Sequence, residues 1–163
     1  MRCKPSMRAS SPSQHNYLTF KGFPAAQGLV TPDGALLIPM RNAITNNVQG
    51  AQLIRWVEDE RRYEKKMLPG MKAKGAVLRL GKPARETLLV EGFATGLSVE
   101  AAARSVGLNA AVLVTFSDSN LVHVAPMVKG KAYVYADNDK SGAGERAAKI
   151  GRASCRERVS SPV

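Results

Sequence analysis

Acidic residues follow two short apolar segments in the second half of the chain. Glu91 comes directly after the run ending at Val90, and Asp137 and Asp139 come directly after the run Tyr133–Ala136. Apolar runs of this length indicate buried strands, and sites in open α/β sheets form at the carboxyl ends of such strands. If the two strands are parallel, three carboxylates lie together at one edge of the sheet. Such a cluster requires a cation, and carboxylate oxygens suit Mg²⁺ or Mn²⁺.

Each half of this constellation also has a simpler interpretation. A Glu-Gly pair after a strand is typical of a turn, and an Asp-x-Asp sequence occurs in solvated loops and at helix N-caps. The strand context on both sides favours the metal site. A cation held there positions phosphate oxygens and stabilises charge at a phosphoryl centre.

The elements that must position these carboxylates alternate over residues 83–149. The expected order is strand 87–90, helix 95–106 closed by Gly107, strand 111–116, a short helix 120–128 interrupted by Pro126, and strand 131–136. Strand, helix, strand, helix, strand is typical of an α/β fold with a parallel sheet flanked by helices.

The chain before this region is rich in expected strands. Strands at 35–40, 48–57 and 76–80, with the segment 61–68 and turns between them, predict a small antiparallel β-meander within an N-terminal subdomain, residues 15–82. Residues 1–14 lack periodicity and are interpreted as a disordered segment or linker. Trp56, in the second strand, is interpreted as a core anchor rather than a base-stacking platform.

The chain is strongly basic, with 24 Lys and Arg against 13 Asp and Glu and a net charge of +11. This excess favours a polyanionic partner, although a soluble basic protein without one has the same balance. If the basic residues that precede Glu91 share one face of the protein, they form a phosphate-binding track. If they do not, they are ordinary solvated surface. The candidate phosphate-binding residues are Lys72, Lys74, Arg79, Lys82 and Lys140.

Several classes of protein are disfavoured. The two cysteines, Cys3 and Cys155, lie near opposite ends without a C-x-x-C pair, so no zinc site is expected and a reducing cytoplasm fits. No apolar stretch approaches the ~20 residues of a membrane span, and the N-terminus has no secretory signal, so no membrane partner is expected.

The last residues, 150–163, differ in character from the chain before them. The sequence IGRASCRERV, Ile150–Val159, interrupts an incipient helix and resembles the translation of a short-read sequencing adapter. We therefore expect a non-native tail, with the natural protein continuing differently after Lys149. The alternative is a natural basic tail, and the excess of basic residues persists without it.

The motifs VEGFATGLS and YADND, in this order, resemble those of the Toprim domain. Upstream, HNYLTFKGF, PDGALLIPMRN, QGAQLI and LPG…KGAVLRLG resemble the region that precedes Toprim in phage, plasmid and integrative-element primases. The resemblance spans residues 15–149 and implies a truncated part of a primase or primase-helicase.

The resemblance assigns roles to individual residues. Glu91 matches a glutamate proposed as general acid/base or metal ligand, and Asp137 and Asp139 match the pair that holds Mg²⁺. Gly92 matches the glycine that lets the chain turn tightly beside the site, and Asn120 matches a loop near the active face. The stretch between this loop and Asp137 is shorter than in the family.

The expected activity is Mg²⁺-dependent nucleotidyl transfer in DNA replication: primer synthesis from nucleoside triphosphates on a single-stranded DNA template, with a helicase domain or protein as a further partner. Two alternatives stay open. One is DNA cleavage of the Toprim nuclease or topoisomerase type. The other is a non-catalytic remnant that binds nucleic acid, since this sequence contains no G-x-x-x-x-G-K-[ST] helicase motif.

Overall fold

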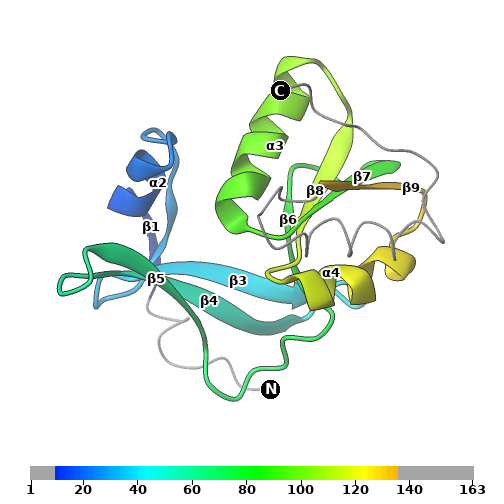
Figure 1. Cartoon of the computed structure of the whole chain (residues 1–163). Coiled ribbons are helices and arrows are strands. Elements are labelled where there is room, and N and C mark those ends of the chain that lie inside the picture. The colour runs from blue at the N-terminus through cyan, green and yellow to red at the C-terminus, as the bar shows by residue number, and fades with distance from the viewer. Residues whose placement is uncertain (1–9, 136–163) are drawn as a thin grey trace. The chain divides into compact units, whose positions relative to one another are not determined.

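A computed structural model describes residues 10–135 of the chain (Figure 1). The chain divides into two compact units, residues 1–73 and 74–163, which we call the N-terminal and C-terminal units. Asp137, Asp139, Lys140 and the predicted tail lie outside the described residues.

The N-terminal unit is built on one antiparallel sheet with strand order β1-β2-β3-β4-β5. Its elements are β1 (Ser11–Ser13), α2 (Asn16–Phe20), β2 (Gly28–Val30), β3 (Leu36–Asn42), β4 (Val48–Val57) and β5 (Arg62–Met67). The succession β3-β4-β5 confirms the predicted meander, because each of these strands pairs with the next one in sequence.

The core of this unit comes from both faces of the central strands and from the short helix. The cross-strand partners Leu36 and Ile54 are both buried, as are Tyr17 and Leu18 of α2. A second cluster contains Leu37, Ala51 and Leu68. Both faces of β3 are therefore covered, which explains its nearly continuous apolar sequence.

The start of the chain differs from expectation. Ser11–Ser13, placed by sequence in a linker, form β1 by pairing with β2, and Asn16–Phe20 form α2. The reason is the partner strand: Ser11 pairs with Val30, far along the chain, and short polar strands carry no periodic signal of such pairing.

The C-terminal unit contains a mixed sheet with strand order β6-β8-β7-β9. Its elements are β6 (Ala76–Leu80), β7 (Glu86–Val90), α3 (Phe93–Ser105), β8 (Ala110–Val114), α4 (Asp118–Val124), a 3₁₀ turn (Ala125–Met127) and β9 (Lys131–Tyr135). Strands β8, β7 and β9 are parallel and accompanied by helices, which confirms the predicted α/β class (Figure 1).

Strand β6 belongs to the C-terminal unit, although sequence placed it with the meander of residues 15–82. It pairs antiparallel with β8, with Leu78 opposite Val114, and the units divide after Ala73. An apolar strand fits either sheet by its sequence alone, so only the pairing decides where it belongs.

The central strands of this sheet are buried on both sides. Val90, Val112 and Val114 are fully buried, as parallel strands between helical layers require. Helix α3 ends before Gly107, whose φ of 70° lies in the left-handed region that a C-terminal glycine provides. Pro126 ends α4 in a single 3₁₀ turn, as its missing N–H predicts. None of the helices within residues 10–135 is long and apolar enough to cross a membrane.

Candidate functional site

The parallel register of the C-terminal sheet brings the ends of three strands to one edge. Val90, the last residue of β7, is the partner of Val114 on one side and of Tyr135 on the other. Glu91 therefore leaves the sheet at the same edge at which the described chain ends. Asp137 follows Tyr135 by two residues in the sequence, and its position lies beyond the described part of the chain.

The backbone at Glu91 is held by the loop that follows β8. The N–H of Phe116 donates to the carbonyl of Glu91 at 2.8 Å, and Thr115 donates to the carbonyl of Val90 through both its N–H and its hydroxyl, at 2.8 and 3.0 Å. Phe116 has a φ of 68°, an unfavourable region for an aromatic residue. These bonds fix the carboxyl end of β7 against the end of β8.

Asn120 lies in the first turn of α4 and is buried. Its Nδ2 donates to the carbonyls of Ala76 and Thr115 at 2.8 and 2.7 Å, and its Oδ1 accepts from the N–H of Gly75 at 2.7 Å. Ser117 caps the same helix by accepting from the N–H of Asn120. The side chain of Asn120 thus supports the loop beside the carboxyl end of β8 by satisfying three backbone groups.

Gly92 is the N-cap of α3, directly after Glu91. Its φ of −93° and ψ of 147° are accessible to any residue, and a Cβ there would meet Thr95 Oγ1 at 3.5 Å, an ordinary contact. The backbone therefore shows no tight turn that requires glycine, contrary to the role implied by sequence. Gly96, one turn later, is the glycine that packing requires, because its Cβ would lie 2.6 Å from Val114.

The candidate phosphate-binding residues are divided between the two units. Lys72 lies in the N-terminal unit, and Lys74, Arg79 and Lys82 lie in the C-terminal unit. All four are exposed, and no ion pair joins any of them to another of the described residues. Their charges are available to a phosphate, and the shared track stays a prediction.

Within residues 10–135, carboxylates outside this edge form no alternative metal centre. Among residues 10–135, no three His, Cys, Asp or Glu side chains gather closely enough to hold a metal ion. The predicted cluster requires Asp137 and Asp139 in addition to Glu91, so the described part of the chain contains one of its three members.

The N-terminal unit has an aromatic surface that was not predicted from its sequence. The interpretation of Trp56 as a core anchor is wrong, because 48% of this residue is exposed. Its ring contacts Tyr63, its cross-strand partner, and the ring of Tyr63 also meets Phe20 of the unpredicted helix α2. The motif HNYLTFKGF contained the signal, as two aromatic residues and a lysine within one short helical segment.

Comparison with known families agrees with the C-terminal fold. Residues 86–158 match the family model described as Toprim domain, beginning with the first residue of β7 and including Glu91, Asp137 and Asp139. Neither a curated protein nor a solved structure matches the chain. The Toprim similarity indicates Mg²⁺-dependent processing of nucleic acid, of the primase, nuclease or topoisomerase type. It continues past Lys149, and a non-native origin of the tail stays a prediction.

Proposed function

We propose that this chain is part of a DNA primase and performs template-directed nucleotidyl transfer, making primers on single-stranded DNA from nucleoside triphosphates. The observation that supports this proposal is the parallel register of β7 and β9. It brings Glu91 and the chain leading to Asp137 to one sheet edge, within a region similar to Toprim. The basic, β-rich region before it, with its primase-like motifs, favours synthesis over cleavage.

The residues at this edge suit a hard divalent cation. Tyr135 lies opposite Val90, so β7 and β9 end together, and the proposal requires Asp137, two residues later in the sequence, to meet Glu91. Carboxylate oxygens are the ligands that Mg²⁺ prefers. Asp137 and Asp139, with Glu91, would hold it, and the ion would supply charge stabilisation at the reacting phosphate.

The chain's own groups would provide the rest of the reaction. Glu91 is suited to accept the proton of the attacking 3′-hydroxyl, because its backbone is fixed by Phe116. The first turn of α3 begins beside it, and the N–H groups of a helix N-terminus attract phosphate. The exposed cations Lys74 and Lys82 would contact phosphates of the triphosphate or the template.

Metal binding and synthesis test the proposal in two steps. Mg²⁺ titration by calorimetry should give a signal in the native protein that disappears in Asp137→Asn/Asp139→Asn and survives in Asp59→Asn, a change at an exposed turn of the N-terminal unit. Unchanged affinity in the double variant would reject the metal site.

Primer synthesis is then measured with labelled nucleoside triphosphates on a single-stranded template. Metal-dependent extension products that the double variant fails to make are expected. If the protein nicks DNA strands but synthesises no primers, the primase proposal is rejected in favour of a nuclease of the Toprim type.

A further inference from the structure

Aromatic rings gather on one face of the N-terminal unit. Trp56 of β4 and Tyr63 of β5 are cross-strand partners, so their side chains emerge on the same face of the sheet. Helix α2 adds Phe20, and the residue before it adds His15. We call these four residues the aromatic patch. The ring of Tyr63 lies at its centre, with centroids 5.1 Å from Trp56, 5.8 Å from Phe20 and 6.4 Å from His15.

Packing of the helix on the sheet accounts for only part of this cluster. Tyr17, whose ring meets Tyr63 edge to face at 5.0 Å, is 1% exposed and belongs to the core. Phe20 is 70% exposed and Trp56 48% exposed, so large aromatic surfaces remain in water at an energetic cost.

An open cavity of about 600 Å³ lies against the patch, within the range of ligand-binding pockets. It is lined by all four aromatic residues and by the amide side chains of Gln14 and Asn16. Such a lining suits a planar group whose edges can form hydrogen bonds. Its flat faces can stack on the aromatic rings, and its edges can bond the amides of Gln14 and Asn16.

Cations surround the patch. The ammonium of Lys21 lies 5.2 Å from the ring centre of Phe20 and 5.9 Å from that of Tyr17. The ammonium of Lys65 lies 6.0 Å from the ring centre of Tyr17. Lys65 follows Tyr63 by two residues in β5 and so shares its face. An occupant that combines a planar ring with negative charge complements this arrangement.

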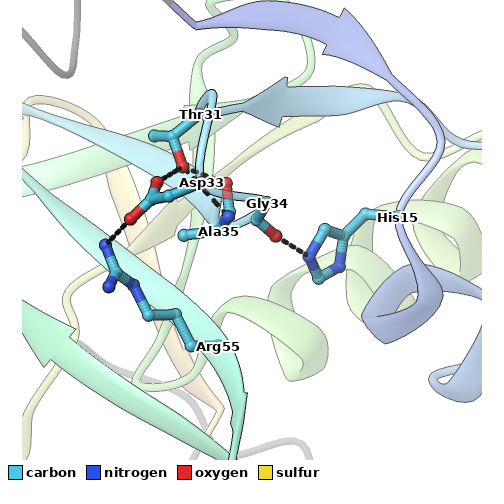
Figure 2. Close-up of polar contacts among 6 residues, drawn as sticks. All are labelled: His15, Thr31, Asp33, Gly34, Ala35 and Arg55. Atoms are coloured by element: carbon cyan, nitrogen blue, oxygen red, sulfur yellow. Dashed lines mark hydrogen bonds and ion pairs between the residues drawn. The ribbon is translucent and has the colours of Figure 1, made fainter.

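The nearby carboxylates are already engaged. Glu58 accepts a hydrogen bond from the indole N–H of Trp56, which orients that ring. Asp33 forms an ion pair with Arg55 at 2.7 Å and accepts a hydrogen bond from the hydroxyl of Thr31 (Figure 2). The ion pair with Arg55 reduces the repulsion that Asp33 would exert on a phosphate.

Backbone contacts hold His15 in place. Its Nδ1 accepts a hydrogen bond from the N–H of Tyr17 at 3.1 Å and so caps α2. The ring proton is therefore on Nε2, which donates to the carbonyl of Gly34 at 3.1 Å (Figure 2). The turn containing Gly34 is braced by Thr31, whose N–H donates to the carbonyl of Ala35 and whose hydroxyl accepts from the N–H of Ala35. The patch is therefore organised before any ligand arrives.

We infer that the aromatic patch is a stacking site for an unpaired base of a single-stranded nucleic acid, with Lys21 and Lys65 contacting the flanking phosphates. Exposed rings beside cations are the means by which proteins bind single strands without reading sequence. The inference goes beyond the proposed function, because strand binding here requires neither the carboxylates nor synthesis.

Trp56 is the only tryptophan of the chain and so reports directly on the site. The full chain is titrated in EDTA with an oligothymidylate of roughly 20 nucleotides, longer than the about 4–16 nucleotides that single-strand sites cover. Tryptophan fluorescence follows stacking, and anisotropy of a labelled strand follows binding. We expect quenching that saturates together with the anisotropy, and weaker binding at higher salt. The matching oligouridylate distinguishes DNA from RNA.

Variants separate stacking from general charge attraction. Phe20→Ser should weaken binding at least about fivefold, the lower end of what one stacked base contributes. Ile44→Ser removes an equally exposed apolar side chain of the same unit and should not. Lys65→Gln should weaken binding, whereas Lys66→Gln, on the opposite face of β5, should have a smaller effect.

Two results would overturn the inference. One is binding by anisotropy without quenching of Trp56. The other is equal affinity in Phe20→Ser and Ile44→Ser, which would leave the patch to an apolar protein partner. The variant Asp137→Asn/Asp139→Asn should bind the strand normally, so failure of the catalytic proposal and failure of this site are distinguishable.

Discussion

Asn120 Oδ1 accepts a hydrogen bond at 2.7 Å from the backbone N–H of Gly75, a residue 45 positions earlier in the chain. With its two bonds from Nδ2, this side chain joins the start of β6, the end of β8 and the first turn of α4. The loop that holds Glu91 by its backbone depends on this junction. Asn120 is therefore a positioning residue for the candidate site, not a group that meets substrate.

Replacing Asn120 by Ala should destabilise the protein by about 2–4 kcal/mol, because three buried backbone groups lose their partners. The measurement is the urea unfolding midpoint. Asn120→Asp should be similarly damaging, since a carboxylate cannot donate to the carbonyls of Ala76 and Thr115. Ser119→Ala, at the exposed neighbour, is the control and should change stability by less than about 0.5 kcal/mol. Equal midpoints for Asn120→Ala and the control would contradict the junction.

The close approach of α3 to the sheet depends on Gly96. A Cβ there would lie 2.6 Å from Val114 Cγ2 and 3.3 Å from Val90 Cγ2, and both valines are fully buried. Gly96→Ala should therefore cost about 1–3 kcal/mol by overpacking, although alanine is otherwise the better helix former. Ser98→Ala, on the exposed side of the same helix, should be neutral or stabilising. If Gly96→Ala stabilises the protein instead, α3 must lie further from the sheet than the 2.6 Å contact with Val114 implies.

Glu91→Gln should abolish most activity while leaving the fold intact. The backbone carbonyl of Glu91, which accepts from the N–H of Phe116, is retained by the substitution, so the loop after β8 should stay in place. Loss of a general base lowers rates by about 10²–10⁴-fold. Glu86→Gln, at the other end of β7, is the matched control and should keep nearly full primer synthesis. Comparable rates in the two variants would remove Glu91 from the site.

Acid should weaken the turn that supports the aromatic patch. The hydroxyl of Thr31 and then the guanidinium of Arg55 lower the pKa of Asp33 below its usual 3.8. A lowered folded-state pKa contributes stability that is present above the usual value and is lost as pH falls through the lower one. Because both partners are about half exposed, the loss should be small.

The measurement is the unfolding midpoint of the native protein and of Asp33→Asn between about pH 6 and pH 2. The difference between them should narrow below about pH 4. A difference that stays constant through this range would contradict a titrating role of Asp33.

The order of elements from β3 onward could be predicted from the sequence because each of these elements carries a local signal. Val48–Val57 and Ala76–Leu80 are strands with the bounds expected, and Gly107 ends α3 as its place after an apolar helical pattern indicated. Periodicity and turn residues act over a few positions and so can be read locally. The α/β class followed from that order alone.

What the sequence determined by itself was the set of carboxylates, the alternation of strands and helices around Glu91 and the resemblance of that region to Toprim. Only the tertiary structure decided that β6 joins the C-terminal sheet, that Asn120 accepts a hydrogen bond from Gly75, and that Trp56 is half exposed beside Tyr63. The physical reason is common to all three. Strand pairing, a buried amide's partners and the exposure of a ring depend on contacts between residues far apart in the chain, which no local pattern encodes.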